Sequence, residues 1–283
     1  MRLFLTLFFV FITSCAGTFQ IERHNQSLIR RTPQINRAET GRVLSKGSFC
    51  ASGGFSYALQ RPGIVQVTDS SFEFKSGILG DEITIMTSAN TYCYESRLQA
   101  SGEAMYAFCD VLSAGLLFDA SLGQIEGLPE GLGREVKNDN IEGALFLKFA
   151  KQYGNIAVSV RPEVGINHLY GDRIWTVSDS SGTKTATEKL SYYSFMARSC
   201  SVLRVQPVNS FSPFIGLELK SQAYPLADDR LVYEVVYGVY GGMDLKAGVF
   251  AISPFITIPL GSTSTHFRSP VAIGTQVSLL LRE

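Results

Sequence analysis

The chain lacks an excess of charge of either sign, because Lys plus Arg and Asp plus Glu each number 25 among its 283 residues. Nothing in this balance points to nucleic acid or to an acidic partner. Histidine is scarce, with His24, His168 and His266 alone, and no Cys–His spacing typical of a zinc site accompanies them. We therefore expect no metal site, no cofactor and no catalytic residue, and we do not expect an enzyme.

The apolar run Leu3–Ile12 is too short to span a bilayer, and it follows Arg2 as the apolar region of a signal peptide does. The residues after it, Ile12-Thr13-Ser14-Cys15, resemble a bacterial lipobox, in which the cysteine becomes the lipidated first residue of the mature protein. Cleavage after Ala16 is the alternative, because Ser14 and Ala16 also satisfy a small-x-small rule. We predict export, a signal peptide over residues 1–15 and lipidation at Cys15.

Four cysteines follow the signal, and an even number in an exported chain favours disulfides. A tight turn at Ala100–Gly102 would place Cys93 and Cys109 opposite one another on neighbouring strands. The remaining pair would then be Cys50 with Cys200. Four free thiols are the alternative.

The chain divides by composition into a polar N-terminal part and a part rich in β-forming residues. Residues 16–46 show little periodicity and are expected to form a flexible tether. Residues 47–283 are expected to form one β domain, with the clearest pattern over residues 102–283. Before that, the expected strands are Ser48–Leu59, Ile64–Ser76 and Asp81–Leu98, separated by turns at residues 61–63 and 77–80.

The clearest alternation runs from Asn155 to Tyr170, where even positions are mostly apolar and odd positions mostly polar or charged. At about 3.3 Å per residue it spans about 50 Å, which exceeds the usual globular strand. A membrane barrel needs such a strand because one face meets lipid and the other a polar lumen. Segments of the same two-faced kind are centred on residues 106–118, 145–149, 193–205, 211–219, 231–239, 250–258 and 271–281.

Longer and shorter connections alternate along this part of the chain. Residues 121–142 and 171–188 are long, whereas the connections at Gly154, at 207–210 and at 242–246 are short. Outer-membrane barrels combine short periplasmic turns with longer outside loops. We predict about ten strands, with eight or twelve as the alternatives.

Two segments carry a family resemblance. Phe211-Ser-Pro-Phe-Ile-Gly-Leu-Glu-Leu219 resembles strands of the small bacterial outer-membrane β-barrel superfamily, and Ile252-Ser-Pro-Phe-Ile-Thr-Ile258 partly repeats it. The resemblance implies an all-β, antiparallel, up-and-down barrel in the bacterial outer membrane. The chain departs from that family at its end, which reads Leu281-Arg282-Glu283 where such barrels usually carry a terminal aromatic residue.

If the apolar faces meet lipid, the lumen receives charges of both signs: Lys148, Arg161, Glu163, Arg198, Arg204, Glu218, Lys220 and Glu234. We expect them to pair and to close the lumen. The expected role of this monomeric barrel is structural, or a surface interaction through loops 121–142 and 171–188, with membrane lipid around it. Two alternatives are a narrow porin-like channel and a soluble, lipid-anchored sandwich or lipocalin-like protein that binds a hydrophobic ligand.

Overall fold

The computed structural model describes the chain in seven ranges, which are 20–29, 37–75, 82–126, 136–179, 182–225, 231–262 and 271–281. Within these ranges, no helix is long and apolar enough to cross a membrane. The signal peptide and Cys15, with its expected lipidation, lie outside the described residues.

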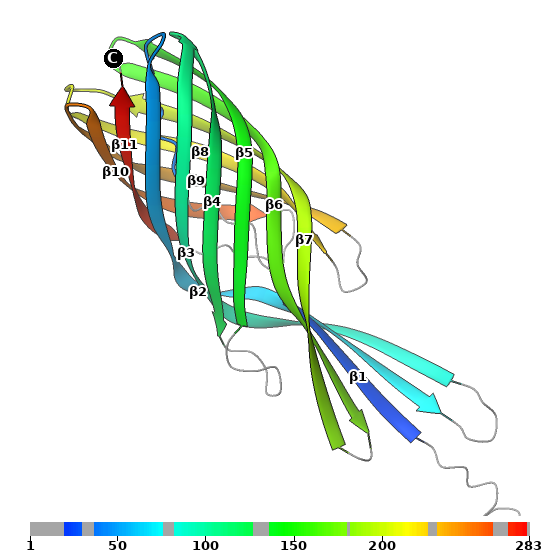
Figure 1. Cartoon of the computed structure of the whole chain (residues 1–283). Coiled ribbons are helices and arrows are strands. Elements are labelled where there is room, and N and C mark those ends of the chain that lie inside the picture. Colours follow the sequence, from blue (N-terminus) through cyan, green and yellow to red (C-terminus); the bar gives the residue numbers. More distant parts are fainter. Residues whose placement is uncertain are drawn as a thin grey trace, which may run out of the picture.

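The described residues form eleven strands in a single antiparallel sheet (Figure 1). Their bounds are β1 Gln20–Ile29, β2 Phe49–Lys75, β3 Glu82–Cys109, β4 Leu112–Glu126, β5 Val136–Tyr153, β6 Ile156–Asp179, β7 Gly182–Val205, β8 Phe211–Pro225, β9 Leu231–Ala247, β10 Phe250–Ser262 and β11 Ala272–Leu281.

The sheet closes on itself, because β2 pairs with β11 as well as with β3. Every strand from β2 to β11 therefore has a neighbour on both sides, and these neighbours are consecutive in sequence except at the closure. The predicted all-β, up-and-down barrel of ten strands is confirmed. Closure satisfies the backbone hydrogen bonds that an open edge would leave exposed.

Tight connections define one end of the barrel, which we call the tight-turn end. They lie at Asp110–Val111, at Gly154–Asn155, at residues 206–210 and at Gly248–Val249. Gly154 and Gly248 have φ of 59° and 60°, the left-handed region in which glycine is favoured. The turn predicted at residues 242–246 is wrong, because these residues belong to β9 and the chain reverses after Ala247.

Two other predicted turns are also wrong. Residues 61–63 lie inside β2, where register shifts between Ala58 and Arg61 and between Ile64 and Gln66 absorb the Pro-Gly pair. Residues 100–102 lie inside β3 and pair with β4. The segment predicted around residues 106–118 is instead two strands, because the chain turns at Asp110–Val111.

The opposite end, which we call the loop end, also differs from expectation. Residues 171–188, predicted as a loop, continue β6 and β7 as a hairpin that pairs as far as Asp179 with Gly182. Of the predicted loop 121–142, only residues 127–135 fall outside the strands, and they also fall outside the described residues.

We call residues 37–48 the plug segment; residues 37–44 lie inside the barrel, and Ser45 and Lys46 are exposed at its tight-turn end. Ser48 and Gly47 are hydrogen-bonded to the backbone of Ala107 near the tight-turn end. β1, by contrast, pairs with the loop-end parts of β2 and β6, as Figure 1 shows. Residues 37–44, which the sequence assigned to the tether, lie inside the barrel instead.

Candidate functional site

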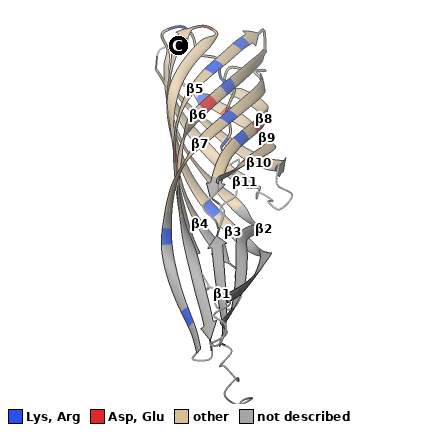
Figure 2. Cartoon of the chain, turned by 90° about the vertical axis from the view of Figure 1, so that its right-hand side faces the viewer, with Lys and Arg blue, Asp and Glu red and all other residues tan. Residues whose placement is uncertain are grey.

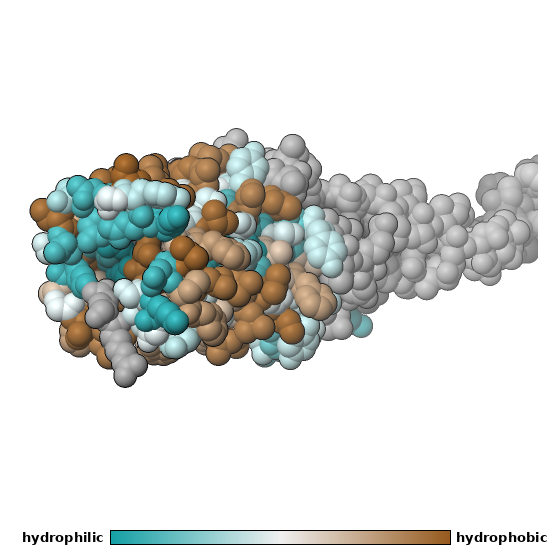
Figure 3. Space-filling model, turned by 90° about the horizontal axis from the view of Figure 1, so that it is seen from above, coloured by the Kyte–Doolittle hydropathy of each residue, from teal (hydrophilic) through white to brown (hydrophobic). Residues whose placement is uncertain are grey.

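The two faces of each barrel strand differ in chemistry. On the outer face the apolar side chains are exposed, as in Phe195 at 75% and Val164 at 63%. Seen from above in Figure 3, brown apolar atoms cover the outer wall and teal hydrophilic atoms gather at the barrel end. On the inner face, Arg161 is 1% exposed and Glu163 is 2% exposed. A closed barrel with an apolar outer belt and a charged interior is suited to lipid around it. The structure is that of a transmembrane β-barrel.

The soluble alternative fails on this arrangement. A lipocalin-like cup or a sandwich would hold its apolar faces inside and its charged faces in water. In this barrel, Leu217 and Leu219 are 60% and 53% exposed, while Glu218 between them is 2% exposed.

All eight charged side chains predicted for the lumen lie inside the barrel, each at most 6% exposed. Figure 2 shows charged positions spread over neighbouring strands of the barrel. The wall carries further inward-facing charges that the sequence analysis did not single out: Arg97, Glu103, Asp119, Glu142 and Asp244.

The plug segment balances the charge of this wall. Among the described residues, seven acidic and six basic side chains face inward from the strands. The plug segment adds one buried acid, Glu39, and two buried bases, Arg37 and Arg42. Acids and bases inside the barrel are then equal in number. A neutral interior avoids the large cost of an uncompensated charge in a narrow, buried space.

Arg161 is the centre of the ion-pair network. It binds Glu39 of the plug segment, Glu103 at 2.8 Å and Glu163 at 2.9 Å. Its guanidinium also lies 3.5 Å from the centroid of the Phe146 ring, a cation–π contact. One arginine from β6 thus links the plug segment to β3 and to its own strand.

The other plug charges are held in the same way. Lys148 binds Glu39 at 2.7 Å, and Arg37 binds both oxygens of Glu163 at 2.7 and 3.0 Å. Nearer the tight-turn end, Arg42 donates to both oxygens of Asp244, at 2.6 and 3.3 Å. Each buried charge of the plug segment therefore has a partner on the barrel wall.

Further pairs link one strand to another without the plug. Arg198 of β7 binds Glu218 of β8 at 2.6 Å, and Arg204 of β7 binds Asp244 of β9 at 2.9 Å. Lys220 of β8 binds Glu142 of β5 across the lumen. β6 and β7 separate these two strands in the sheet, so this pair joins strands that are not neighbours.

The plug residues Arg37, Glu39 and Arg42 were missed because the stretch around them has no strand periodicity. Asp244 did have a signal, since it is buried between the exposed Met243 and Leu245. Glu103 had a weaker one, since it shares the inward parity of β3 opposite to that of the exposed Tyr106. Reading each strand to its end would have found them.

The predicted disulfides are wrong. Cys50, Cys109 and Cys200 are free thiols. Cys93 and Cys109 lie on the same strand, β3, sixteen residues apart, so no turn brings them together. Cys50 is buried beside the plug segment, where it lies 3.9 Å from a guanidinium nitrogen of Arg42.

His168 lies on the outer face, as its position in the alternation predicts. Its Nε2 lies 2.6 Å from the Ser191 hydroxyl, and its ring stacks on Tyr193 with centroids 4.2 Å apart. Ser191 was not singled out from the sequence, because only strand pairing shows that β7 brings it beside β6.

Comparison with solved structures finds proteins of similar fold at low identity. An outer-membrane channel from Pseudomonas putida F1 gives a TM-score of 0.48 at 7% identity over 88% of this chain and 100% of its own. The translocator domain of the autotransporter NalP from Neisseria meningitidis gives 0.44 at 8% identity over 84% and 89%. The β domain of the Bordetella autotransporter BrkA gives 0.43 at 12% over 83% and 99%. No protein-family model and no curated protein sequence matches the chain.

Proposed function

We propose that the protein is a closed, non-enzymatic outer-membrane barrel that holds its N-terminal part at the loop end for a structural or surface-interaction role. The observation that carries this proposal is the plug segment. Its three buried charges each pair with the wall, which supports a lumen closed by the chain itself.

Filling of this kind favours a closed barrel over a porin-like one. Barrels of eight to ten strands are mostly filled by side chains even without a plug, and an open channel generally needs more strands. Here the interior holds an additional stretch of backbone with Arg37, Glu39 and Arg42 upon it. We therefore propose that the intact barrel conducts no ions.

The surface role follows from where the chain enters the lumen. β1 pairs with the loop-end parts of β2 and β6, which extend beyond the barrel together with β3 and β7. If the tight turns face the periplasm, as short turns do in such barrels, β1 lies on the cell surface. The extended hairpin of β6 and β7 and the β1 strand would then form the surface that a partner meets.

Planar-bilayer recording tests the closed lumen. The intact protein is expected to give no conductance steps. The triple variant with Arg37→Ala, Glu39→Ala and Arg42→Ala should give them, because the plug segment then has no charge that pairs with the wall. Lys46→Ala is the matched control, since its exposed side chain lies on the same segment and only its backbone N–H binds Asp110. Steps of equal size from the intact protein would overturn the proposal.

Epitope accessibility on intact cells tests the orientation. A tag placed before Gln20 should be stained on whole cells, as should a tag at residues 180–181. A tag between Asp110 and Val111 should be stained only after the outer membrane is permeabilised. Staining of the Asp110 tag on intact cells would reverse the orientation and remove the surface role of β1.

A further inference from the structure

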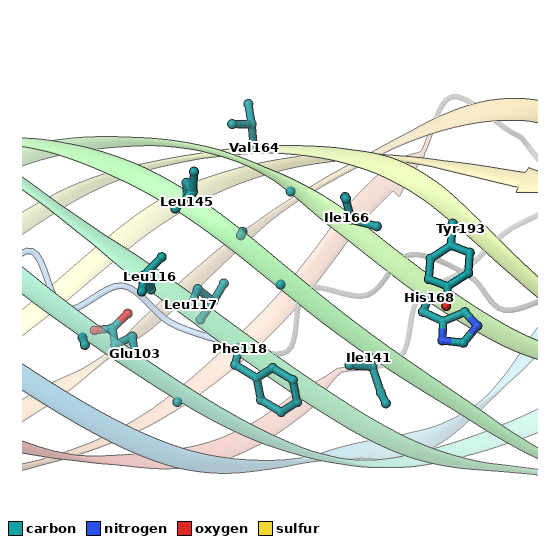
Figure 4. A pocket seen from close by; sticks show the side chains of 15 residues that line it. Glu103, Leu116, Leu117, Phe118, Ile141, Leu145, Val164, Ile166, His168 and Tyr193 are labelled. Atoms are coloured by element: carbon teal, nitrogen blue, oxygen red, sulfur yellow. The ribbon is translucent and has the colours of Figure 1, made fainter.

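A groove of about 880 Å³ runs along the outer wall over β3 to β6. Its lining is mostly apolar, with Glu103 toward one end and His168 and Tyr193 at the other, and it faces the side on which the barrel meets lipid. Figure 4 shows Leu116, Leu145 and Val164 toward one end of the groove and His168 beside Tyr193 at the other.

Two glycines open this groove. Gly143 lies between Phe118 and Ile166 in one cross-strand row, and Gly102 pairs with Phe118 from the other side. A Cβ added at either glycine would meet no atom within 4 Å. The groove therefore exists because side chains are missing from two outward positions, and its sides are formed by Phe118 and Ile166.

The end of the groove nearer the loops is polar. His168 pairs across the strands with Ile141 on one side and with Tyr193 on the other. The Ser191 hydroxyl lies 2.6 Å from the His168 ring, and Tyr170 lies beside it with ring centroids 4.1 Å apart. Tyrosine and histidine with an apolar body and a polar tip suit the boundary between hydrocarbon and headgroups.

A cation lies just beyond this polar end. Lys189 is exposed and lies two residues from Ser191 on the same face of β7, and its partner in register on β6 is Asp172. Along the outer wall, an apolar groove is thus followed by hydroxyl and imidazole groups and then by an ammonium group. A phospholipid has the same order of chemistry, with an acyl chain, an ester-linked glycerol and a phosphate.

We infer that this groove binds one phospholipid, with an acyl chain over Gly143, its glycerol region beside His168 and Ser191, and its phosphate near Lys189. From Val164 to His168 the strand advances by about 13 Å, so the groove accommodates part of a single chain. Lipid elsewhere on the apolar outer wall meets projecting side chains and exchanges freely, whereas the acyl chain in the groove lies between Phe118 and Ile166. The site is independent of the plug and of the closed lumen.

Native mass spectrometry of the purified barrel with added phosphatidylglycerol tests the site. Gly143→Leu fills the groove and should lower the fraction of barrels that retain one lipid by about tenfold. Gly241→Leu is the matched control. It also faces outward between two isoleucines, Ile215 and Ile256, but on the far side of the barrel, and it should retain lipid as the parent does.

The headgroup contact is tested separately with Lys189→Ala. This variant should lose the preference for phosphatidylglycerol over an uncharged diacylglycerol of the same chain length, while retention of the uncharged lipid is unchanged. Equal retention by Gly143→Leu and Gly241→Leu, with both variants still shifting in gel mobility on heating, would overturn the inference and show only freely exchanging lipid. An intact preference in Lys189→Ala would overturn the assignment of the phosphate.

Discussion

The inner and outer faces of β6 are made from alternate residues of one strand, and the relation between polarity and burial is opposite on the two faces. On the inner face Arg161 and Glu163 are buried and paired, and on the outer face Val160 and Val164 are exposed. In a soluble protein the exposed valines would be a defect and the buried charges a rarity. In a membrane the outer solvent is hydrocarbon, so the apolar face needs no partner and the charged face must supply its own.

We predict that a substitution on the inner face of β6 lowers the free energy of unfolding more than a substitution on the outer face. Arg161→Ala would leave Glu39, Glu103 and Glu163 without their shared cation, and it should lower the free energy of unfolding by about 3–5 kcal/mol. Val160→Ala, its outward neighbour, should change that free energy far less, because lipid fills the space. Urea unfolding of the barrel in vesicles, followed by gel mobility, measures both.

A result in which Val160→Ala costs as much as Arg161→Ala would break the comparison. Arg161→Lys sharpens it, because the charge is kept while the two-pronged geometry of the guanidinium is lost. Arg161→Lys should lower the free energy of unfolding by less than Arg161→Ala and by more than Val160→Ala.

A charge introduced on the outer face should destabilise the barrel only where that face lies within the hydrocarbon layer of the membrane. Val164→Arg places a guanidinium in the middle of the exposed belt and should cost about 2–4 kcal/mol. Val208→Arg is the control, because Val208 is also exposed, at 55%, but lies in the tight-turn end. The same unfolding assay applies, and equal costs at the two positions would argue against a bilayer around Val164.

The smallest expected effect concerns the contact between the plug segment and the wall. Gly41 and Gly47 both have positive φ, of 67° and 81°, so alanine at either costs about 1–2 kcal/mol of backbone strain. A Cβ at Gly41 would also lie 2.7 Å from Cγ1 of Val202, whereas at Gly47 it would meet nothing within 4 Å.

Gly41→Ala should therefore destabilise the barrel more than Gly47→Ala and make brief conductance steps more frequent. The two variants share the backbone strain, so the difference in unfolding free energy reports the fit of the plug against β7 alone. Identical behaviour of the two would mean that the plug segment is not packed against Val202 in the membrane.

How much the sequence predicted depended on the part of the chain. From Leu145 to Leu281 the alternation predicted the central part of each strand, though not the ends of β6, β7 and β9, and placed Lys148, Arg161 and Glu234 on the inner face, because lipid on one side allows few exceptions. In β2 and β3 the alternation is interrupted by bulges and glycines, and turns were predicted inside continuous strands. A bulge shifts the period by one residue, which a reader of the sequence takes for a turn.

The sequence by itself determined that this chain forms a two-faced barrel of about ten strands, because the period of two is a local property of each strand. Only the tertiary structure decided which charges meet, as with Lys220 of β8 and Glu142 of β5, which are not neighbours in the sheet. It also decided that a polar stretch without periodicity, residues 37–44, lies in the lumen. Arg37, Glu39 and Arg42 are stabilised there by ion-pair partners more than sixty residues away in sequence. Barrel closure brings the strands that carry these partners around the plug segment.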